Sequence, residues 1–268
     1  MAKDKNKPEE PTTSLATTAP AAPPPVDDSI KERFPIMAME PSGLKELVES
    51  NLGTGTLRAF DLPQLKIPGA GGTTWEVPSI EGTKNVQEVQ GIILHWRDTR
   101  VRFPYEFGKA PPGVKNIPVC KSEDNIAGLG PDPAPGTLCA KCPHSQWQGD
   151  APPTCDTKRL LFFLPEGEML PMTLFLPQQS IKPCRNYFMG LMSKGFNTHS
   201  VITGITLSKE TNPGGIKYAI ARPRMVGKLT REQAAPILAY RQAMMPVFGA
   251  FSVEQDGQGY DGEGDSIS

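Results

Sequence analysis

The chain has 268 residues, of which 26 are Gly and 29 are Pro, and its formal net charge is −1. Gly and Pro make up about a fifth of it, below the share of about 25–30% that is typical of wholly low-complexity proteins. No apolar run approaches the roughly 18 residues of a membrane-spanning helix, so we expect no membrane protein. No apolar segment follows the charged amino-terminal residues, so we expect no secretory signal, a cytoplasmic location and reduced cysteines.

The charges are unevenly distributed along the chain. Residues 156–231 hold eleven Lys and Arg against four Asp and Glu, a net charge of +7. Residues 250–268 hold five acidic residues and no basic ones, a net charge of −5. A basic body with an acidic tail indicates a polyanionic partner such as nucleic acid. A solvated surface with a disordered end is the alternative explanation.

The amino-terminal third carries few regular patterns. Residues 1–33 are rich in Pro, Ala, Thr and charge and cannot bury enough apolar surface to fold, so we predict a disordered tail. A Ser cap, apolar residues at helical spacing and a following Gly predict a short helix over residues 42–50. Residues 51–85 are predicted to form loops and short extended pieces, and their PGAGG sequence lacks the GK[ST] ending of a phosphate loop.

From residue 89 the chain turns to strands, interrupted by a Pro/Gly-rich segment. Pro104 keeps the second strand at an edge or ends it early. Pro183 is expected in the first turn of its helix, unless the helix begins there. We predict strands over residues 89–97, 101–107, 158–165, 168–177, 199–209 and 216–226, and helices over residues 179–194 and from the Thr230 capping box to about residue 245.

Five main strands with a helix inserted late in their order predict a mainly β, α+β domain over residues 34–249. We expect an OB-fold-like Greek-key barrel with flanking helices and a zinc-binding loop insertion at about residues 108–157. An unrelated α+β domain with a similar number of elements is the alternative. Residues 250–268 are predicted to be an acidic, disordered tail. The residues assigned to the core are Phe162, Phe163, Phe175 and Phe188, with Cys184 as a small buried side chain.

Four of the five cysteines fall in the predicted insertion: Cys120, Cys139, Cys142 and Cys155. A Cys-x₂-Cys pair on a tight turn can occupy two corners of a Zn²⁺ tetrahedron, about 2.3 Å from the ion, and two distant cysteines can close it. Because four thiolates leave no open position, the pattern predicts a structural Zn²⁺ site. His144 can replace Cys120 or Cys155 as a ligand, and scattered reduced thiols are the alternative to any site.

No catalytic pattern stands out in the sequence. The three histidines, His95, His144 and His199, lie outside motifs such as HExxH or GxSxG. Glu166 and Glu168 flank a hairpin turn, where paired carboxylates are usually solvated. We therefore expect a protein that is not an enzyme and has no catalytic residues.

Single-strand binding requires a cationic groove for the phosphates and aromatic faces on which bases stack. Basic and aromatic residues interleave on the predicted strands, which favours a shared groove, although packing in the core explains Trp96 equally well. The candidate nucleic-acid-binding residues are Trp96, Arg97, Arg100, Arg102, Tyr105, Lys158, Arg159, Lys217, Tyr218, Arg222 and Arg224.

An OB-like body with a Cys-rich zinc insertion and an acidic carboxyl end resembles the single-stranded DNA-binding proteins of tailed phages and mobile elements. FDLPQLKIPGAGGTTWEVP, GIILHWRDTR and the Cys139-Ala-Lys-Cys142-Pro segment leading into KRLLFFLP are similar to a family of phage and integrative-element proteins without an assigned activity, over roughly residues 44–226. The first resemblance implies sequence-independent coating of single-stranded DNA during replication or recombination in a bacterial host cytoplasm. The acidic tail would cover the groove without DNA and bind replication or recombination enzymes.

Two other function classes fit the same patterns. One is a zinc-ribbon DNA-binding transcription regulator or replication accessory factor, which would prefer duplex DNA or bind a polymerase. The other is a phage or mobile-element enzyme whose active site is assembled from distant segments.

Overall fold

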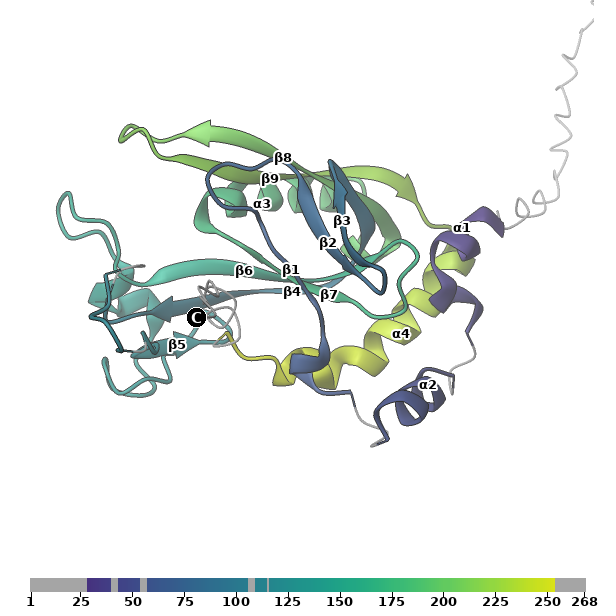
Figure 1. Ribbon diagram of the computed structural model, residues 1–268, viewed down its shortest axis with the longest axis horizontal. Helices are drawn as coiled ribbons and strands as arrows, with labels where there is room; N and C mark the ends of the chain where they lie inside the picture. The colour runs from purple at the N-terminus through teal and green to yellow at the C-terminus, as the bar shows by residue number, and fades with distance from the viewer. Residues whose placement is uncertain (1–27, 40–42, 54–56, 106–108, 115, 254–268) are drawn as a thin grey trace, which may run out of the picture.

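The computed structural model describes residues 28–39, 43–53, 57–105, 109–114 and 116–253 (Figure 1). The α-helices are α1 (Asp28–Arg33), α2 (Gly43–Leu52), α3 (Gln178–Ser193) and α4 (Arg231–Ala250). The strands are β1 (Gln64–Leu65), β2 (Trp75–Ser79), β3 (Gly82–Val86), β4 (Glu88–Arg102), β5 (Cys120–Ser122), β6 (Asp156–Pro165), β7 (Met172–Leu176), β8 (Val201–Thr211) and β9 (Lys217–Lys228). Short 3₁₀ helices occur at Pro35–Ala38, Ala59–Asp61, Cys139–Lys141, Pro143–Ser145 and Thr198–Ser200.

The strands build one curled, mixed sheet and a separate hairpin of β2 and β3 (Figure 1). The order across the large sheet is β1-β7-β6-β4-β8-β9, and β5 pairs with the far end of β4. Neighbouring strands are antiparallel except for β1 and β7, which are parallel. The predicted α+β class is therefore confirmed, as a strand-rich curled sheet with helices around it.

The central strand β4 is a single element of 15 residues, where the sequence predicted two strands. The stretch around Asp98 does not interrupt it, because Asp98 forms an ion pair with Arg159 on β6 and the buried Thr99 hydroxyl donates to the Lys158 carbonyl. The strand ends at Arg102, two residues before Pro104, which has no amide proton for a ladder. Near its start, a Cβ on Gly91 would lie 2.2 Å from the Leu164 carbonyl oxygen, so only Gly fits there.

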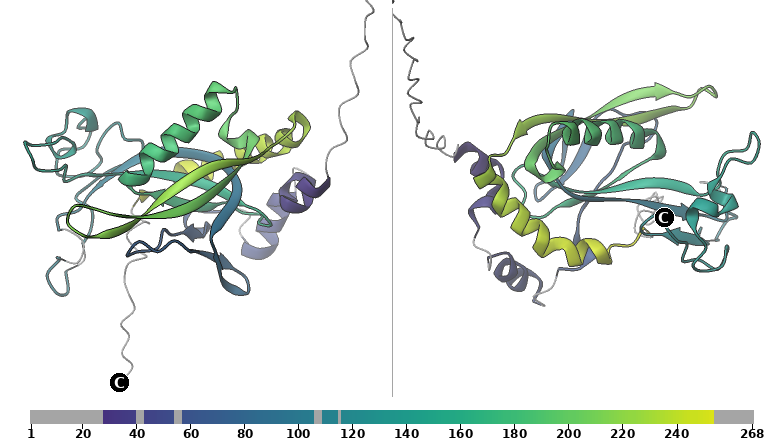
Figure 2. Two further views of the ribbon diagram at one scale, coloured as in Figure 1. Left: turned by 90° about the horizontal axis from the view of Figure 1, so that it is seen from above. Right: turned by 180° about the vertical axis from the view of Figure 1, so that it is seen from behind.

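Alternate residues of the sheet face two separate cores. On β6, Leu160, Phe162 and Leu164 pack against α4, whereas Leu161 and Phe163 pack against α3 and β2. Figures 1 and 2 show α3 and α4 on different sides of the curled sheet. The assignments of Phe162, Phe163, Phe175 and Cys184 to the core are confirmed, and Phe188 is half-buried against the second core.

The two long helices begin where the sequence predicts. For α4, the Thr230 hydroxyl accepts from the Gln233 amide at 3.3 Å and the Gln233 side chain accepts from the Thr230 amide at 2.8 Å, which is the predicted capping box. In α3, Pro183 lies in the second turn and not in the first. The helix continues past it because Cys184 and Leu191 are buried against the sheet.

Some residues that the sequence assigned to the two disordered tails are part of the folded structure. The sequence assigned residues 28–33 to the amino-terminal tail, but they form α1, and Ile30 and Phe34 are buried in the core. At the other end Phe251 and Val253 are each 4% exposed. The sequence signal at the amino-terminal end was the spacing of Ile30 and Phe34, which lie four positions apart as on one helix face. The rest of both tails lies outside the described residues.

None of the helices in the described parts of the chain combines the length and apolar character that crossing a bilayer requires.

Two histidines, His95 and His199, lie in surroundings that disfavour their charged form. Burial and the charge of Arg241 lower the pKa of both His95 and His199. A histidine whose pKa is lower in the folded than in the unfolded state binds its proton more weakly in the folded state. Its contribution to the free energy of unfolding is complete above the unfolded pKa of about 6.5 and is lost as the pH falls through the folded pKa. We predict that the free energy of unfolding, measured with urea, decreases from about pH 7.5 to 5.5 and that a double His95→Gln, His199→Gln variant flattens this slope. An unchanged slope in the variant would contradict this assignment.

Candidate functional site

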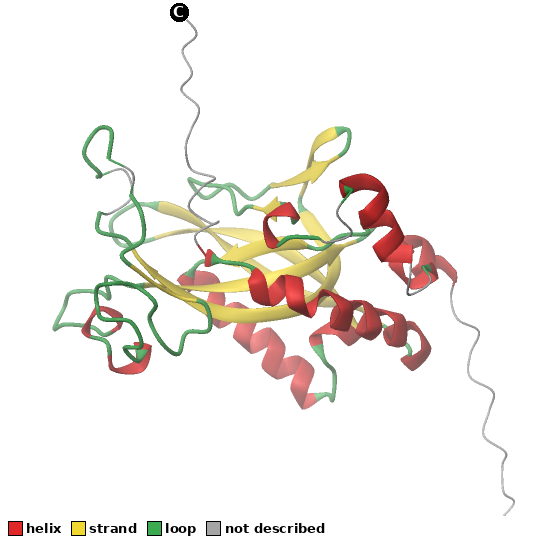
Figure 3. Ribbon diagram, turned by 90° about the horizontal axis from the view of Figure 1, so that it is seen from below, coloured by secondary structure: helices red, strands yellow, loops and turns green. Residues whose placement is uncertain are grey.

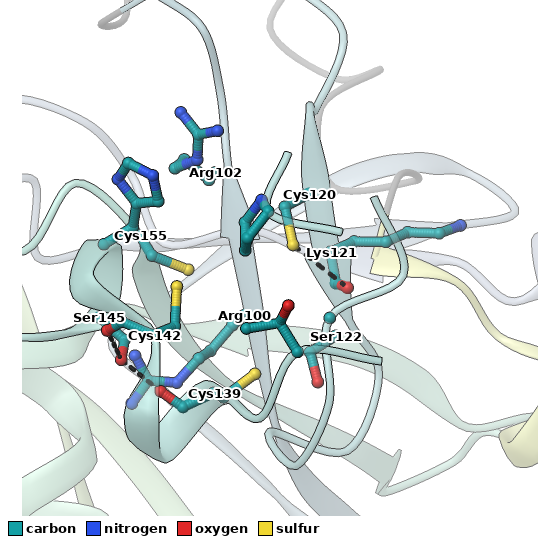
Figure 4. A pocket seen from close by; sticks show the side chains of 13 residues that line it. Arg100, Arg102, Cys120, Lys121, Ser122, Cys139, Cys142, Ser145 and Cys155 are labelled. Atoms are coloured by element: carbon teal, nitrogen blue, oxygen red, sulfur yellow. Dashed lines mark hydrogen bonds between the residues drawn. The ribbon is translucent and has the colours of Figure 1, made fainter. Parts of the chain in front are cut away.

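The four predicted zinc ligands lie around one small cavity of about 10 Å³ (Figure 4). Cys120 begins β5, Cys139 and Cys142 stand at the starts of two short 3₁₀ turns, and Cys155 precedes β6. Cys120, Cys139 and Cys142 are buried and Cys155 is half-buried. Residues separated by up to 35 positions in the chain, from 120 to 155, are therefore brought to one place.

Hydrogen bonds and glycines shape the walls of this Cys pocket. The Ser145 hydroxyl lies beside the carbonyl oxygens of Cys139 and Cys142 and donates to the latter at 2.9 Å, which closes the Cys-x₂-Cys turn. A Cβ on Gly128 would lie 2.8 Å from the Cys120 sulfur, and one on Gly130 would lie 2.0 Å from the Val119 carbonyl oxygen. The chain can approach Cys120 this closely only because both positions are Gly.

The donor set suits Zn²⁺, but the side chains are not gathered into a closed ligand set. Within the described ranges no group of three or more Cys, His, Asp or Glu side chains is arranged to hold a metal ion. His144 also lines the pocket, with its Nδ1 at 3.2 Å from the Thr154 hydroxyl. Four sulfurs and one imidazole thus line the same cavity. The structure does not distinguish a ligand set of four cysteines from one in which His144 replaces Cys120 or Cys155.

The charge around the pocket comes mainly from arginines. Arg100 and Arg102 line it together with Lys121, and Figure 4 shows the Arg100 side chain running beside the cysteines. Burial raises the pKa of the Cys155 thiol to about 11, the charge of Arg100 opposes this, and the nearby Cys120 and Cys139 add to it. A bound cation would reverse the effect of burial, since it stabilises thiolates.

Arg159, predicted to contact nucleic acid, is instead part of the protein interior. It is 4% exposed, and its guanidinium donates to both oxygens of Asp98 at 2.7 and 2.9 Å. The same guanidinium lies 4.5 Å from the centre of the Trp96 ring, which packs on Phe188. Trp96 itself is 37% exposed, so it is only partly covered by these contacts.

Arg97 is also held inside the structure, on the side of α4. Its guanidinium donates to the Phe248 carbonyl at 3.2 Å, to the Phe251 carbonyl, and to Glu123 at 3.2 Å. Burial lowers the pKa of Arg97, and the charge of Glu123 opposes this. A phosphate would have to displace these partners to reach it.

The other candidate arginines are exposed or half-buried but paired. Arg102 pairs with Asp132 and Arg222 with Glu210. Arg224 donates to both oxygens of Glu88 at 2.7 and 2.8 Å, and this hydrogen bonding lowers the pKa of Glu88. Arg100 donates to the Asn125 side chain. Arg100 and Arg102 line the Cys pocket, and a phosphate that bound any of these four arginines would compete with the partner named here.

Three other candidates do come together, in a groove of about 240 Å³. Lys158 at the start of β6 and Lys217 and Tyr218 at the start of β9 line it. A third lysine, Lys66, follows β1 and also lines this groove, although it is not among the residues predicted from the sequence. The described lining residues include no Asp or Glu; they are Gln64, Leu65, Lys66, Ile67, Pro68, Gly69, Ala70, Lys158, Phe175, Pro177, Gln179, Lys217, Tyr218 and Ala219. We call this the lysine groove.

The Gly-rich PGAGG sequence forms one wall of the lysine groove. Gly71 has a φ of +71°, and a Cβ there would lie 3.0 Å from Lys209 Cγ and 3.3 Å from Lys217 Cβ. The loop can lie on β8 and β9 only because this position is Gly. The sequence signal for this wall of the groove was the glycine-rich stretch that follows Lys66. Tyr105, 39% exposed, does not line the groove, and its backbone is held by the Asn116 side chain.

Comparisons with models of protein families, with curated proteins and with solved structures find no match to this chain.

The buried ion pair gives a direct test of the structural assignment of Arg159. Replacing Asp98 with Asn leaves a buried guanidinium without its carboxylate, so we expect a loss of about 3 kcal/mol in the free energy of unfolding. Glu210→Gln, which removes the exposed partner of Arg222, is the matched control and should cost under about 1 kcal/mol. Both are measured by chemical denaturation, and equal effects of the two variants would contradict the assignment.

Proposed function

We propose that this protein binds single-stranded DNA without sequence preference and holds one structural Zn²⁺ in its Cys pocket. The observation that carries the proposal is the lysine groove, where Lys66, Lys158 and Lys217 stand beside the Tyr218 side chain. Lysines neutralise backbone phosphates, and a tyrosine ring offers a face on which any base can stack. The resemblance to phage and mobile-element proteins suggests a role in DNA replication or recombination.

The order of the strands supports an OB-like barrel. Taken as the first to fifth strands, β4, β6, β7, β8 and β9 stand in the spatial order third, second, first, fourth, fifth, with α3 between the third and fourth. OB folds bind oligonucleotides across their second and third strands and the loops that join strands one to two and four to five. The lysine groove contains residues of β6 and β7 and the beginning of β9, which are the corresponding positions.

Two loops flank this region in the way the proposal requires. The segment between β4 and β6 carries the Cys pocket, and the turn between β8 and β9 carries residues 212–216. Figure 1 shows the β8–β9 hairpin and the segment between β4 and β6, which carries the cysteines, extending toward the same end of the molecule, and Figure 3 shows long loops gathered at that end. A single strand that lies in the lysine groove would pass between these two loops.

The zinc part of the proposal follows from how little apolar surface is buried by the segment between β4 and β6, here called the Cys-bearing segment. Several of its large apolar side chains are exposed, among them Ile126, Leu129, Leu138 and Trp147. Such a segment gains little from burial, so a metal held by Cys120, Cys139, Cys142 and Cys155 or His144 would supply the missing stabilisation. When bound, the ion would cross-link the loop; it takes no part in a reaction.

The acidic end of the chain fits the same proposal. Residues 250–268 carry a net charge of −5, and a segment of this kind competes with phosphates for lysines. Without DNA it would cover the groove, and with DNA bound it would be free for replication or recombination enzymes. A zinc-ribbon regulator of duplex DNA is the second candidate, because the Cys-x₂-Cys pair at Cys139 and Cys142 is also the ligand spacing of zinc ribbons.

The zinc proposal predicts one Zn²⁺ per chain in protein purified without chelators, measured by elemental analysis. Cys142→Ser should lower the zinc content and the thermal midpoint, because one of four ligands is lost. Cys184→Ala, which removes a buried thiol outside the pocket, is the matched control and should retain zinc. Zinc-free protein that takes up no Zn²⁺ would rule the site out.

The groove proposal predicts that Lys158→Gln and Lys217→Gln weaken binding to labelled oligo-dT, measured by fluorescence anisotropy. Each variant should also reduce the salt dependence of log K by about 0.7, the value for one neutralised phosphate on a single strand. Lys84→Gln, an exposed lysine on β3, is the control and should have little effect. Binding that prefers duplex over oligo-dT would favour the zinc-ribbon regulator instead.

A further inference from the structure

Glu123 joins two parts of the chain that are far apart in sequence. It directly follows β5, the strand that begins with Cys120. Its carboxylate accepts hydrogen bonds from the Ser252 hydroxyl at 2.9 Å and from the Val253 amide at 3.2 Å. The Lys121 ammonium donates to the same Ser252 hydroxyl at 3.1 Å. The strand that carries one wall of the Cys pocket thus also holds the end of the described chain.

Arg97 completes this junction from the central strand. It donates to Glu123 at 3.2 Å and also to the carbonyl oxygens of Phe248 and Phe251. Because α4 ends at Ala250, these carbonyls belong to the last helical turn and its exit, where donors from the helix itself are missing. One guanidinium therefore links β4, the residue after β5 and the end of α4.

The residues held by this junction are part of the core. Phe251 and Val253 are each 4% exposed, and the Phe251 ring lies edge-on to Phe162 with 5.8 Å between centres. Phe251 also lies 6.0 Å from the ring of Phe175, a residue that lines the lysine groove. Residues 248–253, here called the C-terminal segment, therefore include a ring next to one residue of the groove lining.

We propose that Glu123 is a positioning residue that couples metal occupancy of the Cys pocket to docking of the C-terminal segment. This inference rests on the zinc site proposed above. With only three residues, β5 is held to the sheet by its short pairing with β4, so an ion bound to Cys120 restrains it and with it the Glu123 carboxylate. Linkage is reciprocal, so the docked C-terminal segment must in turn improve retention of the ion.

The coupling has a consequence for the acidic end of the chain. Residues 254–268, with five carboxylates, begin directly after Val253. Metal occupancy would then fix the point at which this negative charge starts, which the Glu123 carboxylate holds through the Val253 amide. Loss of the ion would release that point.

The test uses the full-length, zinc-loaded chain and its Glu123→Gln variant. Zinc affinity is measured by competition with a chromophoric chelator, and docking by hydrogen exchange in the peptide that covers residues 248–253. We expect Glu123→Gln to weaken zinc binding about fivefold. We also expect zinc removal to speed exchange of this peptide in the unaltered chain, and the variant to exchange fast with or without zinc.

Two further variants keep the outcome interpretable. Ser252→Ala leaves the Glu123 carboxylate in place and removes only the hydroxyl that joins the C-terminal segment to Glu123 and to Lys121 of β5, and it should weaken zinc binding about twofold. Glu81→Gln, an exposed carboxylate at the β2–β3 turn, should leave zinc affinity unchanged. Unaltered protein that binds no zinc would overturn the zinc site itself, whereas tight zinc binding that neither Glu123→Gln nor Ser252→Ala changes would overturn the coupling alone.

Discussion

The hydrogen bonds along both edges of β4 are the constraint on which the rest of the structure depends. This strand pairs with β6 over most of its length, with β8 near its start and with β5 near its end. Its residues therefore touch every part that matters for function: the two cores, the Cys pocket through Arg100 and Arg102, and the end of α4 through Arg97. A shift of one residue in its register would turn each of these side chains to the opposite face.

The way the cations are distributed follows from where charge can be buried. Guanidinium groups make several directed hydrogen bonds at once, so this chain uses Arg97 and Arg159 inside the structure, each against a carboxylate. Lysines, which are strongly hydrated point charges, stand at the rim of a groove whose described lining residues include no carboxylate. Net charge along the sequence cannot separate these two uses, because both contribute equally to it.

The Cys-bearing segment shows how strongly a loop can depend on a few close contacts. Gly128 and Gly130 let its backbone approach Cys120, and Ser145 ties the Cys-x₂-Cys turn to itself. These contacts place four thiols and His144 around one cavity, while the segment leaves large apolar side chains exposed. The segment buries little apolar surface, and a bound ion contributes most to folding in segments of this kind.

The sequence by itself determined the local elements: the apolar run of β6, the capping box of α4, the helix at α2 and the α+β class. These depend on interactions within a few residues, which periodicity and caps encode directly. The Cys-x₂-Cys spacing likewise singled out the four residues that share a cavity. Only the tertiary structure decided that β4 is one strand and that Ile30, Phe251 and Val253 belong to the core. It also decided that Arg159 is buried while Lys66 lines the groove. Each of these depends on a partner dozens of residues away, such as Asp98 for Arg159 or Glu123 for Val253, and a pattern read along one segment carries no information about such a partner.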